Sequence, residues 1–157
     1  MRSNNSELTL YETCGSVIRL LNNGDYPVAV VGLDAILNSL IVNQRKIPDM
    51  RKAAALLSWA QGNVLAFVMK DRKDITDANR RKVVLAAYKD ARDFSSSPSN
   101  KRTLDVIINA VENGISFSVL KQNCEPNFPK DTVDVLRDLL PKLKEIPFPP
   151  IPPNTTT

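Results

Sequence analysis

The chain has 157 residues, of which 43% are hydrophobic and 24% charged, and a formal net charge of +4. This length fits one domain that buries about 70% of the surface of its unfolded chain, so it needs neither a metal nor a disulfide for stability. Histidine is absent, and the two cysteines, Cys14 and Cys124, lie far apart. Cys/His zinc sites, disulfide frameworks and histidine-based catalysis are therefore excluded.

The sequence carries no pattern of export or membrane insertion. Its first residues contain no apolar run of signal-peptide length, and its longest apolar stretches fall far short of the ~20 residues that a membrane-spanning helix requires. We therefore expect a soluble protein in the reducing environment of the cytoplasm, with a nuclear location as the alternative.

The first part of the chain predicts two helices. Apolar residues recur at helical spacing over residues 6–23, with Ser6 as the N-cap and Gly24 as the C-terminal stop. Residues 26–43 are apolar on nearly all sides, which is typical of a buried helix. Their β-branched content leaves a strand open, but the length of the run favours a helix. We expect this second helix to lie at the centre of the fold.

The middle of the chain predicts two more helices. Residues 50–69 are rich in alanine and leucine, which are strong helix formers, and the Gly62–Asn63 pair is a candidate kink. A further helix, capped by Thr76 or Asp77, extends to about Phe94. The stretch SSSPSN that follows is predicted to be a loop.

The last third predicts shorter helices. Leu104, Ile107, Ile108 and Val111 form one helical face, and the alternating run at 115–120 is compatible with a strand, although the lack of partner strands favours a helix.

The last helix is expected to begin with Asp131 as its cap. Pro141 would either end it at Leu140 or kink it, because proline removes a backbone hydrogen bond inside a helix.

These elements indicate an all-α protein, an irregular bundle of about six helices with an extended proline-rich C-terminal tail. The sequence shows no internal repeat. We assign residues 1–145 to a single helical domain and residues 146–157 to the tail.

The tail is the segment with the plainest suggestion of use. Five of its seven residues from 147 to 153 are proline, which favours an extended polyproline II rod of roughly 20 Å. Such rods dock in aromatic grooves of partner proteins. Docking on the chain's own domain and a spacer role are the alternatives. The residues of this protein-binding candidate are Pro147, Phe148, Pro149, Pro150, Ile151, Pro152 and Pro153.

The chain's positive charge is concentrated in the stretch KDRKDITDANRRK at residues 70–82. Residues 51–100 hold ten Lys and Arg against five Asp. A basic cluster of this kind indicates a phosphate-contacting surface for RNA, DNA or an anionic membrane surface, and binding to nucleic acid would weaken steeply with salt. An ordinary solvated helix face is the competing interpretation, since three aspartates lie among the cations. The candidate nucleic-acid or anion-binding residues are Lys70, Arg72, Lys73, Arg80, Arg81 and Lys82.

Signals for catalysis are weak. Ser58 and Cys14 lie in apolar helical stretches without a nucleophile motif around them. The aspartates Asp71, Asp74 and Asp77 have a spacing that would share one helix face and suit a hard cation, but the surrounding cations favour salt bridges. Trp59 is expected to be a core anchor. We expect no catalytic residue, no metal and no cofactor.

The sequence thus favours a non-enzymatic helical module for protein–protein interaction, or an adaptor, with a proline-rich docking tail. Self-association through the apolar second helix is an additional possibility. The alternative function is nucleic-acid binding by a protein of viral or packaging type, through the basic cluster.

Overall fold

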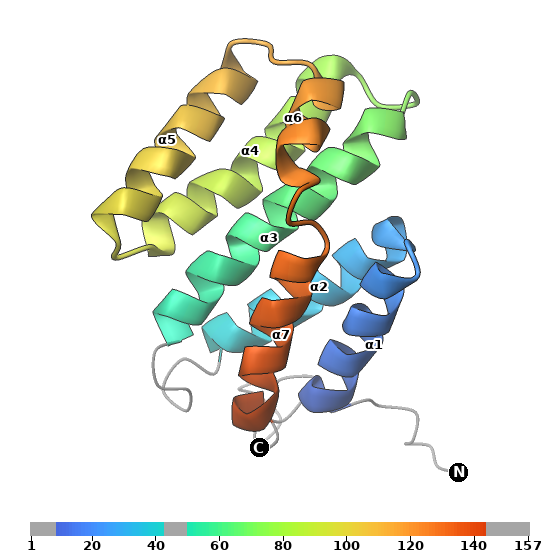
Figure 1. The fold of residues 1–157 in the computed structure, drawn as a ribbon, viewed down its shortest axis with the longest axis vertical. Coiled ribbons are helices and arrows are strands. Elements are labelled where there is room, and N and C mark those ends of the chain that lie inside the picture. The colour runs from blue at the N-terminus through green and yellow to red at the C-terminus, as the bar shows by residue number, and fades with distance from the viewer. Residues whose placement is uncertain (1–8, 43–49, 144–157) are drawn as a thin grey trace, which may run out of the picture.

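The computed structural model describes residues 9–42 and 50–143, and within these ranges all regular secondary structure is helical (Figure 1). This agrees with the predicted all-α class. The described helices are α1 (Leu10–Asn22), α2 (Tyr26–Val42), α3 (Met50–Asp71), α4 (Asp77–Phe94), α5 (Pro98–Glu112), α6 (Phe117–Cys124) and α7 (Lys130–Leu143). The run at 115–120 belongs largely to α6, as favoured, and not to a strand. Because α6 is separate from α5, residues 9–42 and 50–143 hold one helix more than the six or so expected.

The centre of the bundle is α3. It packs against α2, α4, α6 and α7, whereas α1 packs against α2 and α7, and α5 packs against α4 (Figure 1). The prediction that residues 26–43 form the central helix is therefore wrong. α2 lies at the periphery of the bundle and buries Ala29, Leu33, Ile36 and Leu40, while other apolar residues on it face solvent.

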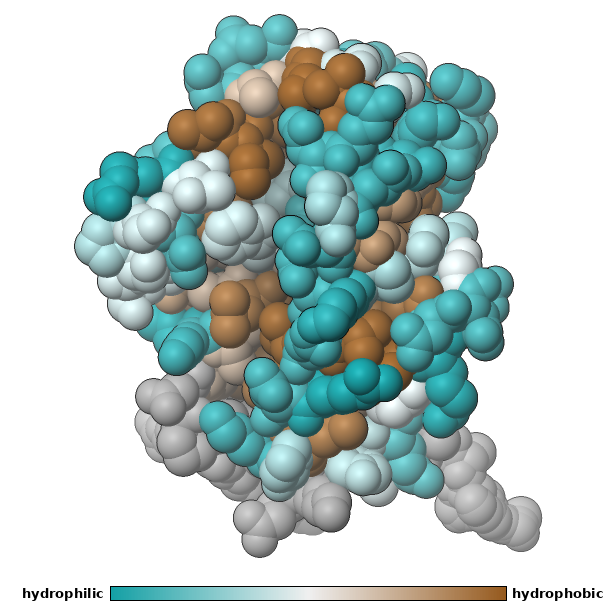
Figure 2. All heavy atoms as spheres, viewed as in Figure 1, coloured by the Kyte–Doolittle hydropathy of each residue, from teal (hydrophilic) through white to brown (hydrophobic). Residues whose placement is uncertain are grey.

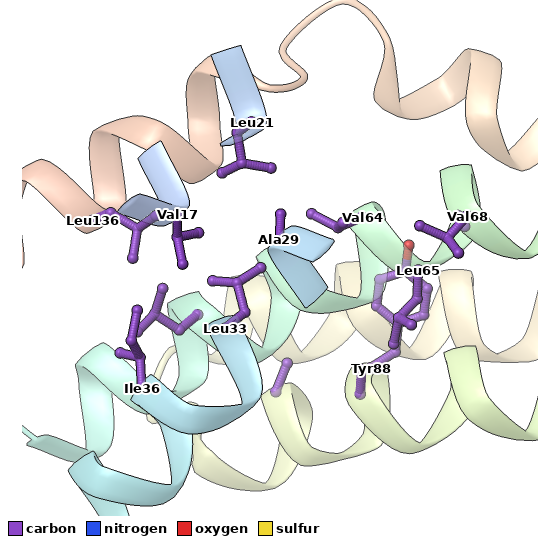
Figure 3. Packing of buried hydrophobic residues seen from close by; sticks show 14 of the residues in the cluster. Val17, Leu21, Ala29, Leu33, Ile36, Val64, Leu65, Val68, Tyr88 and Leu136 are labelled. Carbon is purple, nitrogen blue, oxygen red and sulfur yellow. The ribbon is translucent and has the colours of Figure 1, made fainter. Parts of the chain in front are cut away.

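One continuous core joins the helices. In Figure 3, Val17 of α1, Leu33 of α2 and Leu136 of α7 lie on one side of α3, and Tyr88 of α4 lies on the other. All four side chains are at most 1% exposed. Burial of an aliphatic side chain of this size stabilises the fold by about 1.5–3 kcal/mol, so the two sides of α3 anchor the bundle.

The starts of several helices differ from the prediction in informative ways. The first helix begins at Leu10, and its N-cap is Thr9, which forms a reciprocal capping box with Glu12; Ser6 lies outside the described residues and is not the cap. The stretch SSSPSN is only partly a loop, because Ser97 caps α5 and Pro98 opens it. A proline without an N–H group fits the first helical turn.

The last helix also corrects the sequence interpretation. It begins at Lys130, so Asp131 lies inside its first turn and is not its cap. It continues through Pro141 to Leu143, and therefore does not end at Leu140. Leu143 is fully buried, and this burial offsets the hydrogen bond that proline removes.

Two glycines permit close contact between helices. A β-carbon at Gly62 would lie 2.5 Å from the ring of Tyr88, and one at Gly32 would lie 2.4 Å from Val17. Real β-carbons do not approach other atoms so closely, so these glycines let α3 meet α4, and α2 meet α1. Gly62 is thus a packing residue within α3, which runs as one helix from Met50 to Asp71, and the kink expected at Gly62–Asn63 stays a prediction.

Three aromatic rings fasten one end of the bundle. Tyr26 at the start of α2 meets Phe67 of α3 edge-on at 5.6 Å, and Phe67 stacks at 4.0 Å on Phe128 in the α6–α7 connection. Tyr26 and Phe128 are 4.9 Å apart. Such pairs add about 0.5–1.5 kcal/mol beyond the area they bury, so this cluster holds the α6–α7 connection against α2 and α3.

Within residues 9–42 and 50–143, no helix combines the length and the apolar character that crossing a bilayer requires.

Candidate functional site

The structure divides the basic cluster into two groups, and the first consists of Arg80 and Arg81. Arg81 donates hydrogen bonds to the carbonyl oxygens of Val111 (3.2 Å) and Ile115 (2.6 Å), and Arg80 donates to that of Met69 (3.1 Å). Both guanidinium groups also lie over the ring of Phe117, at 5.2 and 5.1 Å from its centre. Their side chains are only 14% and 17% exposed.

These contacts give Arg80 and Arg81 a role in folding. The last carbonyl groups of a helix have no partner within that helix, and a guanidinium placed there satisfies them and complements the helix dipole. Arg80 does this for α3 and Arg81 for α5. Contact with the ring of Phe117 then attaches α6 to the same corner. One guanidinium nitrogen of each arginine thus donates to backbone carbonyl groups, and Nε of Arg80 is buried without a hydrogen-bond partner among the described residues.

The second group, Lys70, Arg72, Lys73 and Lys82, remains on the surface. Arg72 forms a two-pronged ion pair with Asp74 at 2.8 and 2.7 Å, which lowers the pKa of that carboxyl to about 2. Lys70 lies 3.6 Å from Asp71. Lys73 and Lys82 are exposed. The structure therefore does not bring all six cations to one surface in a form ready to contact phosphates.

The three aspartates of residues 70–82 form ion pairs with the lysines and arginines of the same stretch. Asp77 lies 2.7 Å from Arg81 and 3.6 Å from Arg80, and hydrogen bonding from Arg81 is the main cause that lowers its pKa. With Asp71 and Asp74 paired as above, each carboxylate has a cationic partner, as the sequence favoured. In the part of the chain that the structure describes, no cluster of three potential metal ligands is found.

The residues considered for catalysis lie in the interior. Cys14 donates to the carbonyl oxygen of Leu136 at 3.4 Å, and burial raises the pKa of its thiol to about 12, so the thiolate required for nucleophilic attack is suppressed at neutral pH. Ser58 is 3% exposed. Trp59 is only partly buried and packs against the core, while it also lines a surface groove. Trp59 thus packs against the core, as predicted, but is not fully buried.

Cys124 belongs to a small polar network between α3, α4 and α6. Its thiol and the hydroxyl of Tyr88 both donate to the side-chain oxygen of Asn63, at 3.3 and 2.8 Å. Burial raises the pKa of both donors, which keeps them protonated and able to donate. The network satisfies the one polar atom of the buried Tyr88 and thereby supports packing.

The protein-binding tail, Pro147–Pro153, lies outside the described residues, as does the boundary at residue 146. Its docking role remains a prediction from the sequence.

The most unusual surface feature is the exposure of four large hydrophobic residues on α2, Val28 and Val31 in its first half and Ile41 and Val42 at its C-terminal end. These side chains are 57%, 69%, 42% and 62% exposed. The only charged residue of α2 is Asp34. Single exposed hydrophobic residues are normal on soluble proteins, but several on one helix mark a surface that another molecule covers. We call these four residues the α2 stripe.

Beside the α2 stripe lies a groove of about 480 Å³, the α2–α3–α4 groove. α2 and α4 each pack on α3 but, within the described residues, not on each other. The groove is the space they leave, and α3 forms its floor with one residue per turn. Its lining consists of Val30, Asp34, Leu37, Ser58, Gln61, Leu65, Met69, Val83, Ala86, Ala87 and Asp90.

The polar residues that line this groove are Asp34, Ser58, Gln61 and Asp90, of which the two aspartates are acidic. Gln61 of the floor is 4% exposed and donates from its side-chain nitrogen to Asp34 at 2.7 Å and to the carbonyl oxygen of Val30 at 3.5 Å. Its side-chain oxygen, Oε1, is buried without a hydrogen-bond partner. Desolvation raises the pKa of Asp34, and desolvation followed by the charge of Asp93 raises that of Asp90.

A second groove lies between α3 and α7. Two adjoining hollows of about 250 and 370 Å³ share Leu56, Val135 and Asp138, and Trp59 lines the second. Figure 2 shows this face, where apolar side chains form strips on either side of a hydrophilic ridge over α7. Lysines and aspartates both line this groove, so its charge is mixed.

Comparisons with protein-family models, with curated proteins and with solved structures found no match. The function of the chain is therefore argued from its own surface.

The sequence interpretation missed Gln61 and Asp90. A signal was present for Gln61, since it interrupts an alanine- and leucine-rich helix at a position one turn from Ser58. Asp90 carried none, because it lies on α4 among many other charged residues. Asp34 was noted only as an interruption of an apolar run.

Proposed function

We propose that this chain is a non-enzymatic helical module for protein–protein interaction, which binds through the α2 stripe and uses its proline-rich tail as a second docking element. The observation that carries the proposal is the exposure of Val28, Val31, Ile41 and Val42 on one helix. The α2–α3–α4 groove beside them extends the apolar surface.

Physical considerations support a partner for this face. Exposing an apolar side chain costs about 25 cal/mol for each Å² that another protein would cover, and a patch of several such residues is typical of an interaction site. The inward use of Arg80 and Arg81 gives the alternative, nucleic-acid binding, less support than the sequence suggested, since four surface cations remain and two of them are paired with aspartates.

The test is a double substitution on the stripe, Val28→Asp with Val31→Asp, compared with a matched control. The control is Val106→Asp with Val119→Asp, two valines that are 70% and 44% exposed on α5 and α6. Complexes formed by the full chain in cells are fixed by crosslinking, and the self-association of the purified chain is measured by sedimentation velocity.

We expect the stripe variant to lose the complexes that the wild type and the control retain, with circular dichroism unchanged. Loss of a dimer in sedimentation would identify a second copy of the chain as the partner. If the stripe variant forms the same complexes as the wild type, the proposal is wrong.

Deletion of residues 146–157 tests the tail. We expect the deleted chain to keep its helical signal and melting temperature and to lose partner capture. Unchanged capture would remove the tail from the proposal.

A further inference from the structure

The α2–α3–α4 groove has residues at helical spacing along its floor, which suits the binding of one more helix. Ser58, Gln61, Leu65 and Met69 follow each other along α3 at intervals of three and four residues and form one straight row. At 1.5 Å per residue the row is about 16 Å long, or three turns of helix. The walls, α2 and α4, both run along this row.

The walls offer apolar contacts at helical spacing as well. Val30 and Leu37 lie two turns apart on α2, and Val83 and Ala86 lie one turn apart on α4. Val83 and Ala86 are exposed. An amphipathic helix docks in such a groove by inserting side chains from successive turns between the walls. The floor residues are at most 7% exposed, so a docked helix would reach them with its side chains.

The negative charges in the groove indicate that its occupant carries a positive charge. Asp34 on one wall and Asp90 on the other are its only charged lining residues. Neither carboxylate has an ion-pair partner among the described residues. Between these walls the buried oxygen of Gln61 lacks a donor. All three groups accept hydrogen bonds, and a lysine or arginine side chain supplies donors and the opposite charge.

From this arrangement, and on the basis of the proposed function, we infer that the groove binds an amphipathic helix of a partner protein that directs a lysine or arginine side chain towards Asp34, Asp90 and Gln61. The apolar side chains of the same helix contact Val30, Leu37 and Val83.

Two other occupants fit this chemistry poorly. The chain's own tail has no lysine or arginine from residue 145 to residue 157, so it cannot supply the cation. The α2 helix of a second copy carries no cation, and it would add another Asp34 to the groove. The geometry therefore favours a different, basic helix.

A displayed library of helical peptides tests the inference while the partner is still unidentified. The peptides are about 15 residues long, with leucines at fixed positions of one face and all amino acids at the remaining positions. The full chain serves as target in three forms: wild type, Asp34→Asn with Asp90→Asn, and a control, Asp131→Asn with Asp138→Asn. The control removes two carboxylates that line the α3–α7 groove.

Binders that compete with one another and fail to bind an Ala86→Arg variant are assigned to the α2–α3–α4 groove. Among these we expect lysine and arginine to be enriched about tenfold at one position, for the wild type and for the control. The enrichment should disappear with the Asp34→Asn, Asp90→Asn target.

Groove binders without this preference, or with the same preference on all three targets, would overturn the inference. So would a selection in which no binder is sensitive to Ala86→Arg. These outcomes leave the proposed function intact if the Val28→Asp, Val31→Asp variant still loses its complexes. If that variant keeps them, the proposed function fails whatever the library shows.

Discussion

α2 and α3 are neighbours with opposite relations between composition and burial. α2 is composed almost entirely of apolar residues, yet Val28 and Val31 are more than half exposed. α3 carries charged residues near both of its ends and contains Ser58 and Gln61, yet its middle is buried nearly all round. The position of a helix in the bundle decides its burial, since α3 has helices on several sides and α2 does not.

The residue sizes in α3 explain how it occupies the centre. Alanine occurs repeatedly along it, and Gly62 faces the ring of Tyr88. Small side chains let neighbouring helices approach the α3 backbone, so the centre of a bundle needs compact residues more than strongly hydrophobic ones. A peripheral helix that exposes several large apolar side chains is therefore a sign of an external partner.

The largest predicted difference between α2 and α3 is the loss of unfolding free energy caused by a valine-to-alanine substitution in each helix. Val64→Ala removes a fully buried side chain of α3 and should cost about 2–3 kcal/mol of unfolding free energy, through lost transfer energy and a cavity. Val31→Ala on α2 removes a side chain that is 69% exposed and should change stability by less than about 0.5 kcal/mol. Urea denaturation measures both, and equal losses would contradict the assignment of α3 as the centre.

The next effect concerns the close approach at Gly62. Gly62→Ala gains helix propensity but drives a methyl group into the buried Tyr88 ring, so we expect a net loss of about 1–2 kcal/mol. Gly15→Ala is the matched control in α1, where the new methyl meets only the end of Arg19 at 3.8 Å, and it should gain up to about 1 kcal/mol. A stabilising Gly62→Ala would show that α3 and α4 can separate without cost.

The smallest effect is the pH dependence of Asp34. Desolvation raises the pKa of the Asp34 carboxyl in the folded state, so folding favours its protonated form. The contribution of Asp34 to the free energy of unfolding therefore decreases as the pH rises from the pKa of the unfolded chain through the pKa of the folded protein. Asp34→Asn keeps an oxygen for Gln61 and removes the charge. It should raise the melting temperature slightly at pH 7, and the gain should vanish near pH 3.

The control for this change is Asp93→Asn, whose carboxylate is 68% exposed. A lower melting temperature for Asp34→Asn at pH 7 would mean that the Asp34 carboxylate stabilises the isolated fold.

The helices could be predicted from sequence because their signals are local. Thr76 caps α4 as one of two expected residues, and Phe94 ends it, since capping and turn residues act on the neighbouring backbone. The centre of the fold could not be predicted in this way. Burial depends on which helices meet, and the periodicity of residues 26–43 says nothing about the partners on each side.

In the candidate site, too, local features could be predicted from the sequence and contacts between helices could not. The charge of residues 70–82 was plain in the sequence, but the inward turn of Arg81 depends on Val111 and Ile115, about thirty residues further along the chain. The role of Gln61 likewise depends on Asp34 of another helix. Contacts between helices assign these side chains, so spacing along one helix could not identify them.

The inward-facing Arg81 has a practical consequence for anyone who probes the charged stretch by mutagenesis. A variant that neutralises all six cations at once would also release the ends of α3 and α5 and the ring of Phe117. Such a protein would fail in any binding assay because that corner comes apart, and the failure would be mistaken for a lost phosphate contact. Exchanging only Lys73 and Lys82 leaves the corner assembled and yields an interpretable result.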